Sequence, residues 1–177
     1  VICMEGIRKE LMRMMDMAKD NVHEAFNAVK EKNKEKYMEV EQKEEYVDFL
    51  NKEISKYITS AISFETTKTG SKIFNSLFTI TSNIERISDH AVNIAGYSNM
   101  LSDKNIVFSE NANKELDKMQ SICADMFRTL ITRPSDYMAW YERIACMEQK
   151  IDDMTLQFRE NMYKRLHSGN CTDEGSI

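Results

Sequence analysis

Residues 82–96 read SNIERISDHAVNIAG, and this stretch decides the fold because it carries an apolar stripe and a set of charged groups together. The stripe recurs at steps of three and four residues, the spacing that lines one side of an α-helix, at Ile84, Ile87, Ala91 and Ile94. Between these positions stand Glu85, Arg86, Asp89 and His90. The stretch therefore predicts a helix with a buried side and a densely charged outer side.

The same spacing extends outward and predicts three helices within residues 1–101. Upstream, the stripe continues through Ile73, Leu77 and Ile80. Two earlier stripes have this spacing as well: Leu11, Met15, Ala18, Val22, Ala25 and Val29, and then Val40, Val47, Leu50, Ile54, Tyr57 and Ala61. A lysine-rich turn at 31–37 and a small-residue turn at 65–71 separate the three predicted helices.

Beyond the polar link LSDKNIVFSE at 101–110, residues 102–177 begin the pattern again with two further helices. One carries Leu116, Met119, Cys123, Met126 and Leu130, and the other carries Trp140, Ile144, Met147, Ile151, Met154 and Phe158. Pro134 is expected to stop the first of these, and Ser135 to cap the start of the second.

The two segments read as a repeat at an offset of 104 residues. Glu44 with Asp48 corresponds to Glu148 with Asp152, and the stripes of the two matched helices then fall in register. The second segment has no counterpart of the 82–96 helix. We therefore expect the last two helices to pack on the first bundle, or their apolar side to be covered by another chain, as in a homo-oligomer.

Composition narrows the class of protein. The 177 residues are 42% hydrophobic and 30% charged, with one proline and five glycines, which indicates an all-helical chain. A net charge of −5 argues against nucleic acid as the partner, because phosphate backbones are bound by clustered positive charge. No apolar run approaches the roughly 20 residues that span a bilayer. The four scattered cysteines form no paired motif and favour a reducing, cytoplasmic compartment.

A helical wheel drawn on the isoleucine stripe places Glu85 and Asp89 one above the other, both pointing away from the core. Such a pair either belongs to an ordinary solvent-exposed face or serves as a set of metal ligands. The two negative charges repel each other, and the repulsion needs a compensating cation, whether Arg, Lys or metal. The same spacing recurs at Glu44 with Asp48 and at Glu148 with Asp152. Oxygen ligands would suit Mg²⁺, Ca²⁺, Mn²⁺ or iron. We expect Arg86 to brace the carboxylates or to reach acids on a neighbouring helix.

Two kinds of catalytic site are compatible with a helical bundle. A di-iron bundle enzyme needs Glu-x-x-His on two helices, and none of the histidines has a Glu three residues before it. A histidine phosphotransfer bundle would use His90, which follows two acids without a nearby lysine cluster. Because the chain also lacks a glycine-rich phosphate loop and a nucleophile elbow, we expect no enzyme activity.

The run ERISDHAVNIA at 85–95 resembles the signature helix of PhoU-type phosphate-uptake regulators. The segments EEYVDFLNKEI at 44–54 and EQKIDDMTLQF at 148–158 are similar to the second-helix segment of that family. The resemblance implies PhoU-like antiparallel three-helix bundles in tandem, with boundaries at 1–101 and 102–177 and five long helices, the second bundle lacking its third helix.

The resemblance also implies a non-catalytic regulator of phosphate transport on the cytoplasmic side of a bacterial membrane. Its partner would be a membrane phosphate-transport protein or a transmembrane domain of its own chain. The start at Val1 and the turn SFETTKTGSKIF at 63–74 favour the cytoplasmic domain of a sodium/phosphate cotransporter-family protein over a free-standing regulator.

Family members bind metal through E/D-x-x-x-D motifs. Carried over residue by residue, the resemblance implies a divalent metal or iron as cofactor, with ligands Glu85, Asp89, Glu44, Asp48, Glu148 and Asp152. Asn83 stands where the family usually has an acid, and it is a poorer ligand.

Overall fold

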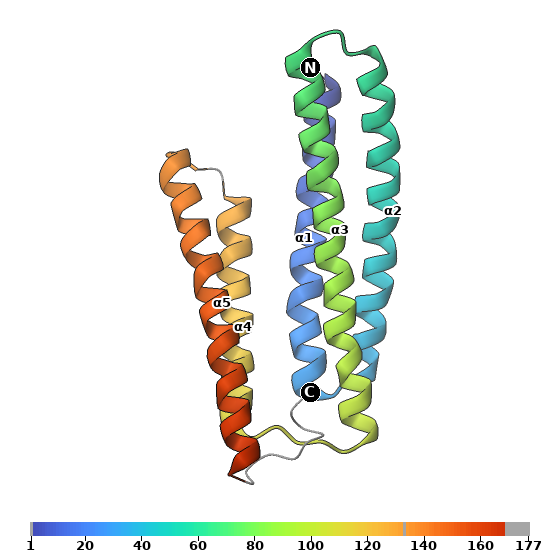
Figure 1. The fold of residues 1–177 in the computed structure, drawn as a ribbon. Coiled ribbons are helices and arrows are strands. Elements are labelled where there is room, and N and C mark those ends of the chain that lie inside the picture. Colours follow the sequence, from blue (N-terminus) through green and yellow to red (C-terminus); the bar gives the residue numbers. More distant parts are fainter. Residues whose placement is uncertain (1, 133, 169–177) are drawn as a thin grey trace.

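A computed structural model describes residues 2–132 and 134–168, which form five α-helices and no β-strand. The helices are α1 (Ile2–Glu31), α2 (Lys34–Phe64), α3 (Lys68–Asp103), α4 (Glu110–Ile131) and α5 (Tyr137–His167). Figure 1 shows α1, α2 and α3 as one long antiparallel bundle with α4 and α5 as a hairpin on its side. The predicted all-α fold with five long helices is confirmed.

Side-chain caps fix where the helices begin, and they make the turns shorter than the sequence predicted. Asn33 accepts hydrogen bonds from the backbone N–H groups of Glu35 and Lys36, so α2 begins at Lys34, inside the predicted turn. The prediction that Ser135 caps the last helix is wrong. Asp136 does so, accepting from the backbone N–H groups two and three residues ahead.

The core of the first bundle confirms the stripes on α1 and α2 in large part, and on α3 it keeps Ile84 and Ala91 of the predicted stripe but otherwise lies one step around the helix. Phe74, Thr81, Ile84, Ser88, Ala91, Ala95 and Ser98 are buried. Ile73 and Ile80, which the sequence placed in the core, are 39% and 43% exposed. On α2, Tyr57 was also misplaced, since it is exposed and Ile58 is buried in its stead.

A buried polar link joins the three helices of the bundle. The Asn21 amide on α1 donates to the Val40 carbonyl on α2 at 3.1 Å and to the Ser88 hydroxyl on α3 at 2.8 Å. All three residues are buried, so the link favours one register of the helices over others. The serine at position 88 thus faces the core because it has this partner.

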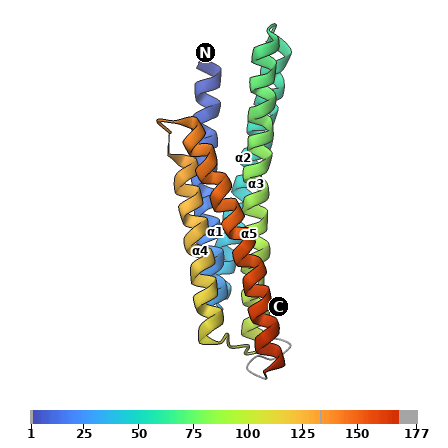
Figure 2. The same ribbon diagram turned by 60° about the vertical axis from the view of Figure 1, so that its left-hand side comes forward.

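The hairpin is attached to the first bundle through α4 alone. Gln120 of α4 donates to the His23 carbonyl and the Asn27 side chain, and it accepts from Lys30, all on α1. Figures 1 and 2 show α4 running beside α1, with the α2–α3 end of the bundle reaching beyond the hairpin. Of the described helices, only α4 contacts α5.

None of the α5 residues is buried, although the sequence gives this helix a regular apolar stripe. Cys123 on α4 is half-buried, and burial raises the pKa of its thiol. Cys146 on α5 is exposed, and Cys171 lies outside the described residues. Within the described part of the chain, no helix has the length and apolar character needed to cross a membrane.

Candidate functional site

The structure brings two of the three predicted carboxylate pairs together along the seam between α2 and α3. Because these helices are antiparallel neighbours, Glu44 and Asp48 of α2 face Glu85 and Asp89 of α3. We call these four residues the acidic strip. The sequence predicted each pair separately, but it did not show that the helices that carry them are neighbours.

The acidic strip lies at the edge of the core. Glu44, Asp48 and Glu85 are half-buried and Asp89 is exposed. Glu85 is therefore closer to the core than the helical wheel predicted. The buried line on α3 keeps Ile84 of the predicted stripe and adds Ser88, and this small rotation brings Glu85 toward α2.

The pKa of Glu44 shows the electrostatic repulsion within the acidic strip. Burial raises the pKa of Glu44, and the charges of Asp48, Asp89 and Glu85 raise it further. Carboxylates on two helices thus interact with one another, and each negative charge makes the next less favourable. Added positive charge at this place would relieve the repulsion.

Lys52 supplies part of that positive charge. Its ammonium lies 2.5 Å from an oxygen of Asp48, one helical turn away on α2, and this hydrogen bond is the main cause of a raised lysine pKa, with smaller contributions from Glu44 and Glu85. Lys52 was not among the predicted site residues, although its spacing of four residues from Asp48 is a local signal for an ion pair on a helix. The expectation that Arg86 braces the carboxylates is not met, because it is exposed and forms no ion pair with a described residue.

Two further residues of the 82–96 stretch have clear positions. His90 is exposed on α3. Gly96 lies against the ring of Tyr37 on α2, where an added Cβ would sit 3.9 Å from a ring carbon. That distance is ordinary van der Waals contact, so the glycine is not required for close approach of the helices here.

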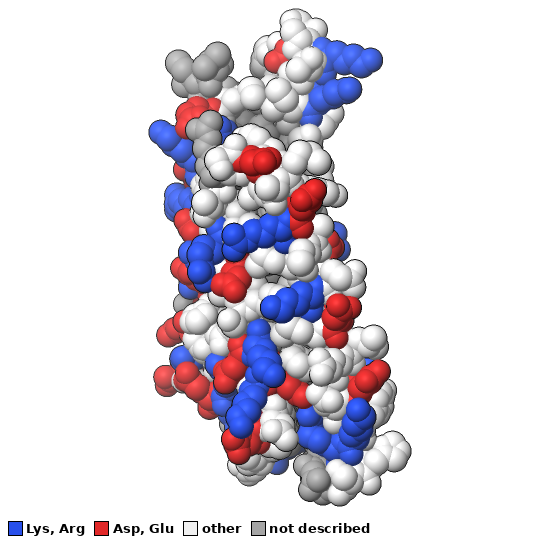
Figure 3. Space-filling model, turned by 90° about the vertical axis from the view of Figure 1, so that its left-hand side faces the viewer, with Lys and Arg blue, Asp and Glu red and all other residues white. Residues whose placement is uncertain are grey.

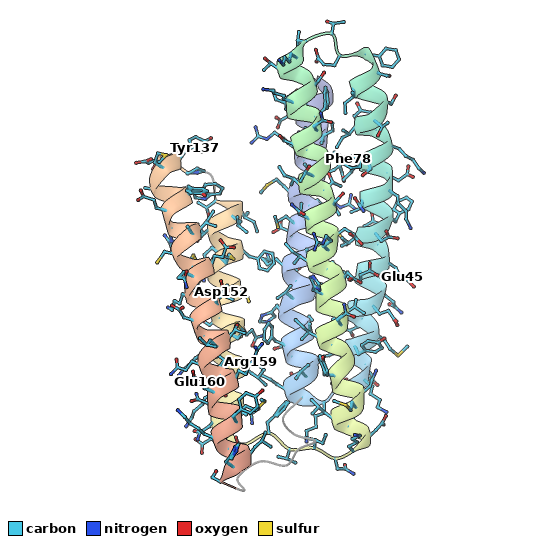
Figure 4. All side chains as sticks on the ribbon, viewed as in Figure 1. Glu45, Phe78, Tyr137, Asp152, Arg159 and Glu160 are labelled. Carbon is cyan, nitrogen blue, oxygen red and sulfur yellow. The ribbon has the colours of Figure 1, made fainter. Side chains whose placement is uncertain are left out.

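The third pair, Glu148 and Asp152, is separate from the acidic strip. Both residues are exposed on α5, which contacts neither α2 nor α3. Figure 4 labels Asp152 on α5 and Glu45, the neighbour of Glu44, on α2, at opposite sides of the molecule. The sequence repeat therefore does not give the α5 pair the environment of its α2 counterpart.

The carboxylate oxygens of the acidic strip suit a hard cation, but these carboxylates do not converge on one point. Among the residues that the structure describes, no three Asp, Glu, His or Cys side chains converge closely enough to hold a metal ion. Carboxylate oxygens from two helices nevertheless offer hydrogen-bond acceptors and negative charge along one line. The strip as it stands can attract a cation or a basic side chain.

The acidic strip lies at the edge of the core of an antiparallel three-helix bundle. The model of the PhoU domain family matches residues 11–97, which span most of α1 and α3 and the whole of α2. This bundle is PhoU-like. A comparison with curated proteins and another with solved structures each gave no match. The PhoU family is regulatory and generally non-enzymatic, and the match indicates a regulatory role in phosphate homeostasis.

Proposed function

We propose that this chain regulates phosphate transport from the cytoplasmic side of a bacterial membrane. Its partner is a membrane transport protein of the sodium/phosphate cotransporter type, either its own transmembrane part or a separate protein. The PhoU match over 11–97 supports the regulatory role, and the acidic strip supports a recognition mode. In this mode a basic side chain of the partner binds the strip.

The observation that carries the proposal is the incomplete neutralisation of the strip. Of the four carboxylates, Asp48 has an ion pair with a described cation, Lys52, and Glu44 still has a raised pKa. A Lys or Arg of the partner, placed over Glu44 and Glu85, would neutralise the negative charge of these two carboxylates. Complementary charge of this kind also speeds encounter and fixes the register of a complex.

A double variant of the strip tests the proposal in cells. In Glu85→Gln/Asp89→Asn, phosphate uptake should lose its response to external phosphate, because the α3 half of the strip is neutral. Glu148→Gln/Asp152→Asn is the matched control, since it removes the same two charges at the same spacing on α5. The readout is the rate of labelled phosphate uptake after growth in high and in low phosphate.

The proposal fails if the strip variant, present at the level of the unchanged protein, regulates uptake as well as the control does. The coding sequence upstream of Val1 separates the two forms of the partner. Several hydrophobic spans there would support a transporter-linked domain, and a start codon immediately before it would support a free-standing regulator.

A divalent cation or iron is the second candidate for the strip, favoured by its all-carboxylate donor set. Because no three of these ligands converge, binding would require side-chain rearrangement around Glu44. Elemental analysis of the natively purified protein and of the Glu85→Gln/Asp89→Asn variant tests this. Equal metal content in the two would exclude the strip as a metal site.

A further inference from the structure

A cationic cleft lies at the far end of the hairpin, between the first turns of α4 and the last turns of α5. Its volume of about 390 Å³ falls in the lower part of the range for small-molecule sites. Its walls include Lys114, Lys118, Lys164 and Arg165, with Glu115 as the one acid among its lining residues. We call this the basic cleft.

Figure 3 looks onto the α4–α5 face, where Lys and Arg side chains are interspersed with acidic side chains along its height. The lining of the cleft, with its four cations and one acid, contrasts with the net charge of −5 of the whole chain. A local excess of positive charge on an acidic protein calls for a specific explanation.

The floor of the cleft is a built ion pair. The two terminal nitrogens of Arg165 lie 3.1 and 3.0 Å from the two oxygens of Glu115, and the Asn161 amide donates to the same carboxylate at 2.8 Å. The Arg165 and Glu115 side chains are only 17% and 14% exposed. The carboxylate oxygens of Glu115 therefore already bind Arg165 and Asn161, and this carboxylate does not neutralise the lysines of the cleft.

Lys118 and Lys164 form no ion pair with any described residue, and Lys114 pairs only with the exposed Glu110. Arg165 in addition keeps a buried Nε–H without an acceptor among the described groups. Buried donors of this kind are rare in folded proteins, so the cleft has hydrogen-bonding and charge capacity that its own residues do not use.

Helix electrostatics explain only half of this arrangement. Lys164 and Arg165 lie in the last turn of α5, where the negative end of the helix dipole favours cations. Lys114 and Lys118 lie in the second and third turns of α4, beyond the first turn in which the helix dipole acts. Lys114 pairs with Glu110, whereas Lys118 has neither an ion pair with a described residue nor a helix end to stabilise it.

We propose that the basic cleft binds a phosphate group, supplied either by inorganic phosphate or by the headgroup of an anionic lipid. Lys118 and Lys164 would provide the charge that holds this anion. The site lies on the hairpin, apart from the acidic strip, so it goes beyond the regulatory function proposed above.

The test uses the full chain and two double variants that change the net charge equally. Lys118→Gln/Lys164→Gln neutralises the cleft, and Lys9→Gln/Lys72→Gln neutralises two lysines at the opposite end of the first bundle. Titration with inorganic phosphate at low salt is followed by calorimetry, and binding to phosphatidylglycerol or phosphatidylcholine vesicles is followed by co-sedimentation. The cleft variant should lose about tenfold or more in affinity, and the control should bind as the unchanged chain does.

Each outcome has a definite meaning. Binding of inorganic phosphate that the cleft variant loses assigns a soluble source, and selective binding to phosphatidylglycerol vesicles that it loses assigns a lipid source. Absence of binding to both probes overturns the proposal, as does an equal loss in the two double variants. Unchanged circular dichroism of the cleft variant shows that a loss comes from charge and not from unfolding.

Discussion

At the scale of single residues, Glu44 shows how the acidic strip costs stability. Its pKa is raised in the folded chain, so the native state retains a proton over a pH interval in which the unfolded chain has already released it. The free energy of unfolding therefore falls as pH rises from the ordinary glutamate pKa, about 4.3, through the raised value. At neutral pH the ionised strip opposes folding.

Glu44→Gln should relieve this cost. We expect the variant to be more stable than the unchanged chain at pH 7 by about 0.5 kcal/mol, the scale of a like-charge pair on a helix. The gain should vanish below about pH 4, where Glu44 is protonated in both states. Urea denaturation across this pH range measures it, with the exposed Glu39→Gln as control. An equal gain in the control would assign the effect to overall charge.

Gly96 permits a second prediction. A glycine inside α3 costs helix stability, and an added Cβ here meets only the Tyr37 ring, in ordinary contact. Gly96→Ala should therefore raise the free energy of unfolding by about 1 kcal/mol. Gly70→Ala is the contrasting variant, because its Cβ would collide with the Glu65 side chain that bonds Thr67 at the start of α3. Thermal denaturation that shows the same gain in both would contradict this reading.

Which residues could be predicted depended on whether the signal was local. The spacing of Glu85 and Asp89 is local, so the sequence identified the pair. Its pairing with Glu44 depends on which helices are neighbours, and its partial burial depends on the rotation of α3. Neither property is encoded within one helical turn, so the acidic strip became visible only in the fold.

At the scale of elements, α3 shows why an apolar stripe can mislead. Ile73 and Ile80 of the predicted stripe are exposed, whereas Ser88 and Ala95, which were not predicted, are buried beside the predicted Ala91. Small side chains let three helices approach closely, and the Asn21 amide satisfies the Ser88 hydroxyl. Hydrophobicity alone favours burial of the isoleucines, whereas close packing of the helices favours burial of the small residues.

The start of α5 offers a direct comparison of the predicted and the observed cap. Asp136 accepts two backbone hydrogen bonds there, while Ser135 is exposed and makes none of the cap bonds. Asp136→Ala should destabilise the chain by about 1 kcal/mol, the usual cost of losing an N-cap. Ser135→Ala should change stability by no more than a few tenths of that amount. Chemical denaturation of the two variants decides between the residues, and a larger loss at Ser135 would restore the original prediction.

At the scale of the whole molecule, stability should be uneven between the bundle and the hairpin. The helices α1, α2 and α3 contact one another along buried lines, whereas α5 has no buried residue and contacts only α4. Amide hydrogen exchange should therefore be faster in the middle of α5 than in the middle of α3. Because the apolar stripe of α5 is complete in the sequence, only the three-dimensional arrangement reveals this difference. Equal protection of the two helices in the isolated chain would mean that α5 is covered in solution, as the predicted homo-oligomer would require.

The attachment of the hairpin can be weakened at one side chain. Gln120 makes hydrogen bonds with His23, Asn27 and Lys30 of α1, and each such bond contributes about 1 kcal/mol net. Gln120→Ala should increase amide exchange throughout α4 and α5 and leave α2 unchanged, because α2 contacts neither helix of the hairpin. Gln149→Ala is the matched control, since Gln149 bonds only Asp153 within α5. If α2 loses protection together with the hairpin, the five helices unfold as one cooperative unit and α1 transmits the loss across the molecule.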